Sequence, residues 1–250
     1  MDLYVPEGCS KCSQSFDFDF TMAFQPIVNV AKRTIHGYEA LVRDRITRTA
    51  YDVLKKVNSD NCHSFDQRCR TKAISLANQL GLESMLSINF LPNAVYKPEH
   101  CIRNTIRAAE VSGFPLERIM FEVTESEKPY DLEHLKGIFE YYKAKGFVTA
   151  LDDFGAGYAS LSMFSSFVPE LIKLDISLVK NVQQDKVKQI VVNSVLDMAK
   201  QLNVTVLAEG VETIEEVRYF EQRGVELMQG FFFARPGYES LPEVDFKLLD

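Results

Sequence analysis

The sequence has few cysteines and no long hydrophobic run, and both absences narrow what the chain can be. Five cysteines in 250 residues, an odd number, do not describe a disulfide framework, which favours a reducing compartment. No run of roughly eighteen apolar residues occurs, and the N-terminus, MDLYVPEGCSKCSQ, resembles neither a signal segment nor an Arg-rich targeting segment. We therefore expect a cytoplasmic protein that does not enter a membrane.

An excess of basic residues is also missing. The chain has 28 Lys and Arg against 35 Asp and Glu, a formal net charge of -7, so no basic field is available for a nucleic-acid backbone. We expect no DNA binding. A small anionic ligand remains possible, because a divalent cation held by acidic residues reverses the local sign of a site.

What is present is an alternation of short β-rich apolar runs with longer helical patterns, which is typical of a parallel α/β sheet. The predicted strands are MAFQPIV, IHGYEALV, MLSINF, RIMFEV, FVTALD, ELIKLD, TVLAEG and VELMQG. The predicted helices lie over residues 65–80, 100–112, 132–145, 186–202 and 214–223. Eight strands in a chain of 250 residues favour one closed (β/α)8 barrel, a fold of about 250 residues.

The first two strands break the pattern. Only AKRTIH separates FQPIVNV from GYEALV, which is too short for a crossover helix and suits an antiparallel turn. The sequence therefore predicts an α/β fold of the modified (β/α)8, TIM-like type with an antiparallel first strand pair. Residues 1–19 are expected to form an N-terminal arm, and residues 20–250 the barrel domain.

Nearly every predicted strand ends in a polar residue. They are Glu39, Asn89, Glu122, Asp152, Asp153, Lys173, Asp175, Glu209 and Gln229. In barrels of this type the C-terminal ends of the strands converge on one face, where active sites are built. Any one of these residues could simply begin a loop, but so many strands ending alike indicate a site.

The chemistry of this set points to divalent cations. Carboxylates gathered on one rim repel one another and raise each other's pKa if left unpaired, and one lysine does not neutralise them. Glu, Asp and Asn oxygens without a Cys or His cluster suit Mg²⁺ or Mn²⁺. Adjacent aspartates, one of them bridging, can hold two cations about 3.5–4 Å apart, as in two-metal phosphodiester hydrolysis.

The sequence resembles the EAL domain family, bacterial phosphodiesterases that act on cyclic di-GMP. The family is named for a triplet present here as Glu39, Ala40 and Leu41. The resemblance rests on FQPIV, YEALVR, LSINF, FEVTE, LDDFGAGY, IKLD, AEGVET and QGFFFARP, in that order. It implies that residues 20–250 form an EAL phosphodiesterase domain that hydrolyses cyclic di-GMP to linear 5′-pGpG and acts as a homodimer.

The resemblance also implies two Mg²⁺ or Mn²⁺ ions per site, with Ca²⁺ inhibitory. One ion would be held by Glu39, Asn89, Glu122 and Asp152, and the second by Asp152, Asp153 and Glu209.

Catalytic roles follow from the same resemblance. Lys173 would orient the attacking water, although it could instead be salt-bridged to Asp175. Glu209 would assist in proton removal, and Gln229 would contact the water or the metal shell. Glu125 would anchor a mobile loop, DFGAGYASL.

Two further residues are candidates for substrate binding. Arg43 lies four residues after Glu39, so on a strand it shares a face with Glu39, and we expect it to contact a phosphate. Gln25 matches a family contact to guanine, but it could equally be a buried structural glutamine. Glu212 could support the site or complement the N-terminus of the following helix.

Three alternatives stay open. Relatives that lose metal-binding acids become catalytically silent cyclic di-GMP receptors or protein-interaction modules. From spacing alone, a Mg²⁺-dependent enzyme of the enolase type with Lys173 as base is conceivable, although it leaves Asn89 and the paired aspartates unexplained. A zinc site is a separate possibility. Cys9 and Cys12 form a lone CxxC that could bind zinc only if other ligands completed the site. Cys62, His63 and Cys69 could supply these ligands, although Cys69 suits a helix core.

Overall fold

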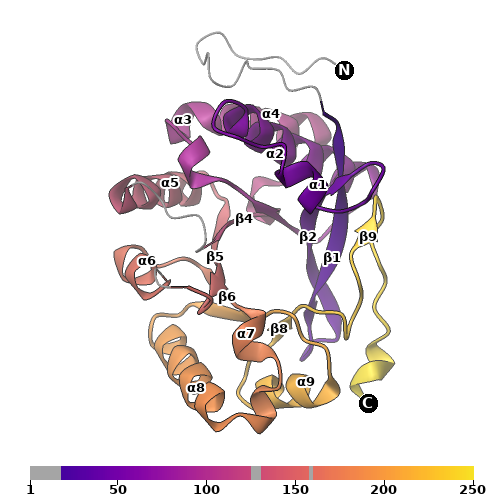
Figure 1. Ribbon diagram of the computed structural model, residues 1–250, viewed down its shortest axis with the longest axis vertical. Helices are drawn as coiled ribbons and strands as arrows, with labels where there is room; N and C mark the ends of the chain where they lie inside the picture. The colour runs from indigo at the N-terminus through magenta and orange to yellow at the C-terminus, as the bar shows by residue number, and fades with distance from the viewer. Residues whose placement is uncertain (1–17, 125–130, 158–159) are drawn as a thin grey trace.

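The strands form a closed barrel that is surrounded by helices (Figure 1). The computed structural model describes residues 18–124, 131–157 and 160–250. Strands β2 to β8 run parallel in sequence order, and β1 closes the barrel by pairing antiparallel with both β2 and β8. The modified barrel predicted from the sequence is therefore confirmed. Residues 1–17 of the predicted arm lie outside the described residues, so that division of the chain stays a prediction.

The strands are β1 (Phe20–Asn29), β2 (Thr34–Asp44), β3 (Met85–Asn89), β4 (Ile119–Thr124), β5 (Val148–Phe154), β6 (Leu171–Leu174), β7 (Thr205–Ala208), β8 (Leu227–Met228) and β9 (Gly237–Tyr238). The helices are α1 (Tyr51–Leu54), α2 (Cys62–Gln79), α3 (Pro98–Cys101), α4 (Arg103–Ser112), α5 (Leu132–Ala144), α6 (Ser160–Ser166), α7 (Ile176–Val179), α8 (Lys186–Gln201) and α9 (Ile214–Glu221). Four 3₁₀ turns occupy Pro92–Ala94, Leu116–Arg118, Val182–Gln184 and Phe246–Leu249. None of the helices among these residues is both long and apolar enough to span a membrane.

The first strand pair forms the predicted hairpin. Strands β1 and β2 pair along their whole length, with Gln25 opposite Glu39. All eight predicted strands are present, together with β9, a strand that the sequence did not predict and that pairs with β1. Two residues give too short a pattern to detect, and β9 forms because the chain returns past the open side of β1 (Figure 1).

The inside of the barrel is apolar in one layer. Six buried residues from six strands meet there: Ile27, Met120, Ala150, Leu171, Leu207 and Leu227. Side chains along a strand alternate between the two faces, so the residue two positions away on each strand also points into the barrel. This alternation places the polar residues described below directly above an apolar layer.

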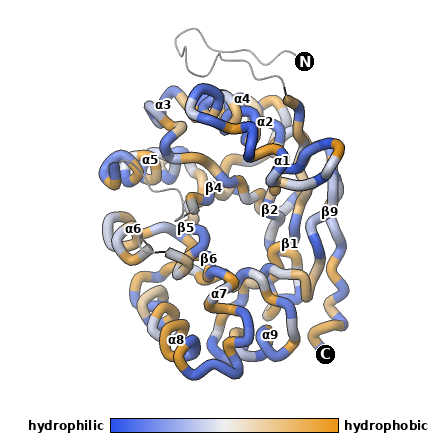
Figure 2. Tube along the Cα trace, in the orientation of Figure 1, coloured by the Kyte–Doolittle hydropathy of each residue, from blue (hydrophilic) through white to orange (hydrophobic). Residues whose placement is uncertain are grey.

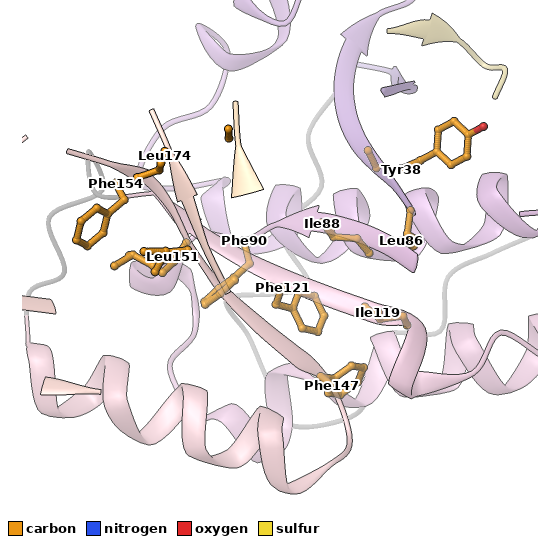
Figure 3. Close-up of a cluster of buried hydrophobic side chains, with 14 of the residues drawn as sticks. Tyr38, Leu86, Ile88, Phe90, Ile119, Phe121, Phe147, Leu151, Phe154 and Leu174 are labelled. Atoms are coloured by element: carbon orange, nitrogen blue, oxygen red, sulfur yellow. The ribbon is translucent and has the colours of Figure 1, made fainter. Parts of the chain in front are cut away.

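The larger core lies between the barrel and its helices. Helix α5 shows the cause, because its buried residues Leu135, Ile138, Phe139 and Tyr142 recur at the helical spacing of three and four. Hydrophobic and hydrophilic positions alternate in the same way along the outer helices in Figure 2. Tyr142 packs against Phe121 of β4, with ring centroids 5.0 Å apart. Phe121 is labelled in the buried hydrophobic cluster of Figure 3.

A buried ion pair crosses this outer core. Asp66 and Arg70, one helical turn apart on α2, form a salt bridge with both side chains almost fully buried. Arg70 also donates to the hydroxyl of Tyr142 at 3.2 Å, and Asp66 accepts from the backbone N–H of Leu91 at 3.0 Å. The pair therefore ties α2 to α5 and to the segment that follows β3.

Replacing Arg70 by methionine should destabilise the protein strongly. Removing one partner leaves the Asp66 carboxylate buried without its counter-charge, which lowers the free energy of unfolding by about 3–5 kcal/mol. Urea unfolding monitored by circular dichroism measures the change. Lys55→Met, which breaks the solvent-screened pair with Asp52, is the control and should move the midpoint little. Equal effects of the two substitutions would contradict this account.

Candidate metal centre

The polar residues of the site lie two positions beyond the apolar layer of the barrel. On β4 and β6 the step runs from Met120 to Glu122 and from Leu171 to Lys173. Corresponding steps lead to Asp152, Glu209 and Gln229, and on the antiparallel β1 the step runs backwards from Ile27 to Gln25. One face of the strands therefore supplies both the apolar floor and the polar mouth.

Lys173 lies at the centre of this layer. Its side chain is fully buried. Its Nζ lies 2.7 Å from Glu209 Oε1, 2.8 Å from Glu122 Oε2, 3.1 Å from Asp152 Oδ1 and 3.6 Å from Glu39 Oε2. Lys173 does not pair with Asp175, the alternative that the sequence left open. The Asp175 carboxylate instead accepts a hydrogen bond from the N–H of Ser177 and caps α7.

Glu39 is fixed by two amide side chains. Asn89 donates to its Oε1 at 2.9 Å, and Gln229 donates to its Oε2 at 2.7 Å. Gln229 also donates to Gln25 at 3.3 Å, and Gln25 donates in turn to the carbonyl of Ala234. The position of Glu39 differs from the expectation, because it lies inside β2, which continues to Asp44, rather than at the end of the strand.

The two adjacent aspartates reach the same site because the backbone leaves the strand conformation between them. Consecutive strand residues point to opposite faces, but Asp153 has a φ of 55°. Its N–H donates to Asp152 Oδ1 at 3.0 Å, and the pairing of β5 with β6 is irregular there. The carboxylates of Asp152, Asp153 and Glu209 consequently each offer an oxygen within 4.8 Å of the others.

A second group of acids shares Asp152 with the first. Oxygens of Glu39, Glu122 and Asp152 also lie within 4.8 Å of one another. Within the described residues, the buried Glu122 Oε1 has no hydrogen-bond partner, so this group includes a residue with an unpaired strong acceptor. The donor set of carboxylate oxygens suits hard divalent cations, and the shared Asp152 suits a bridging role.

The electrostatics show that the acids are not balanced by the protein alone. Burial raises the pKa of Glu122 to about 8, with Glu39 and Asp152 adding to the effect and Lys173 opposing it. Burial, helped by Asp152, raises the pKa of Asp153 to about 6, and it also raises the pKa of Glu209. Five ionised carboxylates and one ammonium would leave four negative charges, which two divalent cations would balance.

Lys173 shows the opposite behaviour. Burial alone would lower its pKa, but Asp152, Glu122 and the other nearby carboxylates raise it well above the usual value for lysine. The ammonium therefore stays charged.

The remaining predicted residues are less closely connected to this centre. Arg43 is half-buried, and it donates to the carbonyl of Val42 at 2.8 Å. Burial lowers its pKa, while Glu39 raises it. Glu212 forms an ion pair with Lys180 at 3.0 Å, directly before α9.

Several predicted residues fall elsewhere. Glu125 and the CxxC of Cys9 and Cys12 lie outside the described residues, so their roles stay predictions. Cys62 Sγ lies 3.3 Å from Nδ1 of the adjacent His63, and Cys69 packs against the core as the sequence allowed.

The fold and the acid-lined mouth define a barrel protein with a candidate centre for two divalent cations. The family model described as "EAL domain" matches residues 13–236, and the chain belongs to the EAL domain family. Solved structures agree. A standalone EAL protein of Vibrio cholerae O395, in its c-di-GMP-bound form, superposes with a TM-score of 0.91 at 52% identity, covering 94% of this chain and 100% of that one.

More distant relatives are longer proteins. Klebsiella pneumoniae BlrP1, solved with manganese and cyclic di-GMP and also with calcium, has a TM-score of 0.84 at 32% identity over 90% of this chain and 57–58% of its own. Among curated relatives of Escherichia coli K12, the antirepressor BluF is 28% identical over 97% of this chain, and the probable cyclic di-GMP phosphodiesterase PdeG is 29% identical over 85%. The chain spans 61% of BluF and 44% of PdeG.

Divalent cations should raise the thermal stability of the protein. A cation that binds only the folded state, present at about 100 times its dissociation constant, adds about 2.7 kcal/mol to the free energy of unfolding. We expect Mn²⁺ to raise the unfolding midpoint relative to EDTA. Asp152→Asn, which weakens both acid groups, should abolish most of the shift, whereas the exposed Asp197→Asn should keep it. A full shift in Asp152→Asn would show that cations bind elsewhere.

Proposed function

We propose that the protein hydrolyses cyclic di-GMP to linear 5′-pGpG with two Mg²⁺ or Mn²⁺ ions. The observation that carries the proposal is the pair of acid groups, one buried and one partly buried, that share Asp152 around Lys173. Support comes from relatives that are named cyclic di-GMP phosphodiesterases and from EAL structures solved with that dinucleotide. A cytoplasmic location, where such a nucleotide would be met, belongs to the same proposal.

Each acid group would hold one cation. The first would be bound by Glu39, Asn89, Glu122 and Asp152, and the second by Asp152, Asp153 and Glu209. Two bound cations supply a water of lowered pKa and stabilise charge on the phosphoryl and leaving oxygens. The orphaned oxygen of Glu122 and the excess negative charge are the features of this chain that fit them.

The protein groups would act on the water and on the phosphate. The Lys173 ammonium would donate a hydrogen bond to the attacking water and offset negative charge that develops on the phosphate. Glu209, whose pKa is raised by burial, would accept the proton of that water. Gln229 would hold Glu39 in place and reach the same water network.

The charge state of Lys173 bears on the enolase-type alternative. A lysine that abstracts a proton must be neutral, whereas the surrounding carboxylates raise the pKa of Lys173. Membership of the EAL family also leaves that alternative without support.

Substrate contacts are proposed for two residues near the mouth. Arg43 would pair with a phosphate of the dinucleotide, since Glu39 lies four residues away on the same strand face. Gln25 would contact guanine, or serve only to hold Gln229, with which it shares a hydrogen bond. Glu125 would anchor the loop beyond Asp153.

A catalytically silent receptor, or a protein-interaction module, is the second candidate function. The observation in its favour is that the relative BluF is named an antirepressor. The complete set of acids favours catalysis, because a receptor has no use for the oxygens that would hold cations.

The proposal is tested by incubating the protein with cyclic di-GMP and separating the products by chromatography. We expect pGpG with Mg²⁺ and with Mn²⁺ but not with Ca²⁺, whose longer and looser coordination misplaces the water. Lys173→Ala and Glu39→Ala should each lower kcat by about 100-fold or more, as loss of a group that stabilises the transition state does. The exposed Asp197→Asn is the control variant and should keep the wild-type activity.

The outcomes separate the candidates. Binding of cyclic di-GMP with no turnover in either Mg²⁺ or Mn²⁺ would identify a receptor. Turnover that survives Lys173→Ala unchanged would contradict the role given to this lysine.

We further propose a homodimer, as the family resemblance implies. An exposed apolar stripe on α8 supports it: Val187, Ile190 and Val191 are 70%, 57% and 41% exposed and share one helix face. Light scattering should show a dimer that Ile190→Asp converts to monomer. Val111→Asp, at a more exposed position on α4, should leave the dimer intact, and a dimer that survives Ile190→Asp would exclude this stripe as the interface.

A further inference from the structure

A short segment between β6 and α8 touches both loops that bring the second acid group together. We call residues 174–181, which include α7, the bridging segment. It follows Lys173 directly in the chain. Apart from Asp175 near its start, no residue of this segment stands out in the sequence.

On one side the bridging segment holds the irregular end of β5, from Asp153 to Phe154, and the loop that follows it. The N–H of Asp175 donates to the carbonyl of Phe154 at 3.2 Å. Leu178 packs directly on Gly155, because a Cβ built on that glycine would lie only 2.4 Å from Leu178 Cδ1. Gly155 has a φ of 99°, so both the backbone shape and the close approach require glycine there.

On the other side it holds the loop that begins at Glu209. The N–H of Glu209 donates to the carbonyl of Leu174 at 3.1 Å. Ile176 packs on Gly210, where a built Cβ would lie 2.4 Å from Ile176 Cγ1 and where φ is 65°. Lys180 adds the ion pair with Glu212.

The two contacts are equivalent in kind. Each loop contributes one acid, Asp153 or Glu209, and each has a glycine one or two residues later that receives an aliphatic side chain of the same helical turn. Ile176 and Leu178 therefore pack on the two glycines that follow these acids in the chain. The other acid group does not depend on this arrangement, because Glu39, Glu122 and Asp152 lie on strands of the barrel wall.

We propose that Ile176 and Leu178 are positioning residues for the second cation. They set the separation of Asp153 and Glu209 and thereby the affinity of the group that these acids form with Asp152. The inference rests on the proposed function only in that the group holds a cation. Truncating either side chain removes the packing that keeps the glycine loop in place, so the acid next to it loses its fixed orientation.

Manganese titration of the substrate-free protein, followed by calorimetry, tests the inference without any use of activity. We expect two binding steps in the wild type. Leu178→Ala and Ile176→Ala should each weaken one step by about 10-fold, the lower end of the effect of groups that orient metal ligands, and leave the other step unchanged. Asp153→Asn identifies the affected step, since it should weaken the same one.

Controls separate positioning from general damage. Ile176 is 41% exposed, so its truncation opens no sealed cavity in the core. Leu178→Met keeps most of the volume and should retain both steps, and Leu178→Val serves if Leu178→Ala unfolds. Val111→Ala, on the exposed face of α4, is the matched aliphatic control. Unfolding midpoints in EDTA verify that each variant is folded.

The possible failures are distinguishable. Suppose that the wild type shows two binding steps and that Leu178→Ala and Ile176→Ala either change neither step or weaken both steps to the same extent. That result would overturn the positioning role and leave the two-cation proposal intact. Absence of paired binding in the wild type would overturn the proposed function, and with it this inference.

Discussion

The burial of one ammonium among four carboxylates is the interaction on which the site depends. Neither charge type is stable alone in the interior of a barrel: an isolated buried lysine tends to lose its proton, and an isolated buried carboxylate tends to gain one. Lys173 keeps its charge because Glu39, Glu122, Asp152 and Glu209 surround it. The same contacts hold the four acids in one place, so the lysine both positions these carboxylates and supplies a positive charge among them.

The barrel makes this arrangement possible by using the alternation of its strands twice. The inward residues at one level are apolar and form a floor, and those two positions on are polar and face the mouth. Glu122 illustrates the benefit, because it stands on a strand whose neighbours on both sides are hydrogen-bonded to it. Groups on such strands are held more precisely than groups on loops.

The sequence predicted the parts of this structure that depend on local pattern. Eight apolar runs gave the strands, the short AKRTIH connection gave the hairpin, and polar residues after apolar runs gave most of the site. Each follows from a rule about spacing. The inward step of two, as from Met120 to Glu122, was also readable and would have assigned the inward face directly.

The rest depended on contacts between distant segments. Glu39 was assigned to a strand end although the predicted strand IHGYEALV runs on to Val42, and β2 in fact continues to Asp44 by pairing with β1. Gly37 permits the close approach of β2 to β3 on its other side, since a Cβ there would lie 2.6 Å from Met85 Cβ. The positive φ of Asp153, which brings a second aspartate to the same face, likewise depends on the tertiary fold and has no local signal.

Other buried acids in the described part of the chain show why the barrel mouth stands apart. Asp66 is neutralised by Arg70 and accepts from the N–H of Leu91. Glu216 has no cation but accepts from three backbone N–H groups, those of Asn181, Glu212 and Thr213. Both carboxylates are therefore satisfied by the fold itself and fix the course of loops. Glu122, equally buried, keeps one oxygen without a partner among the described residues, and a cation at the proposed centre would satisfy it.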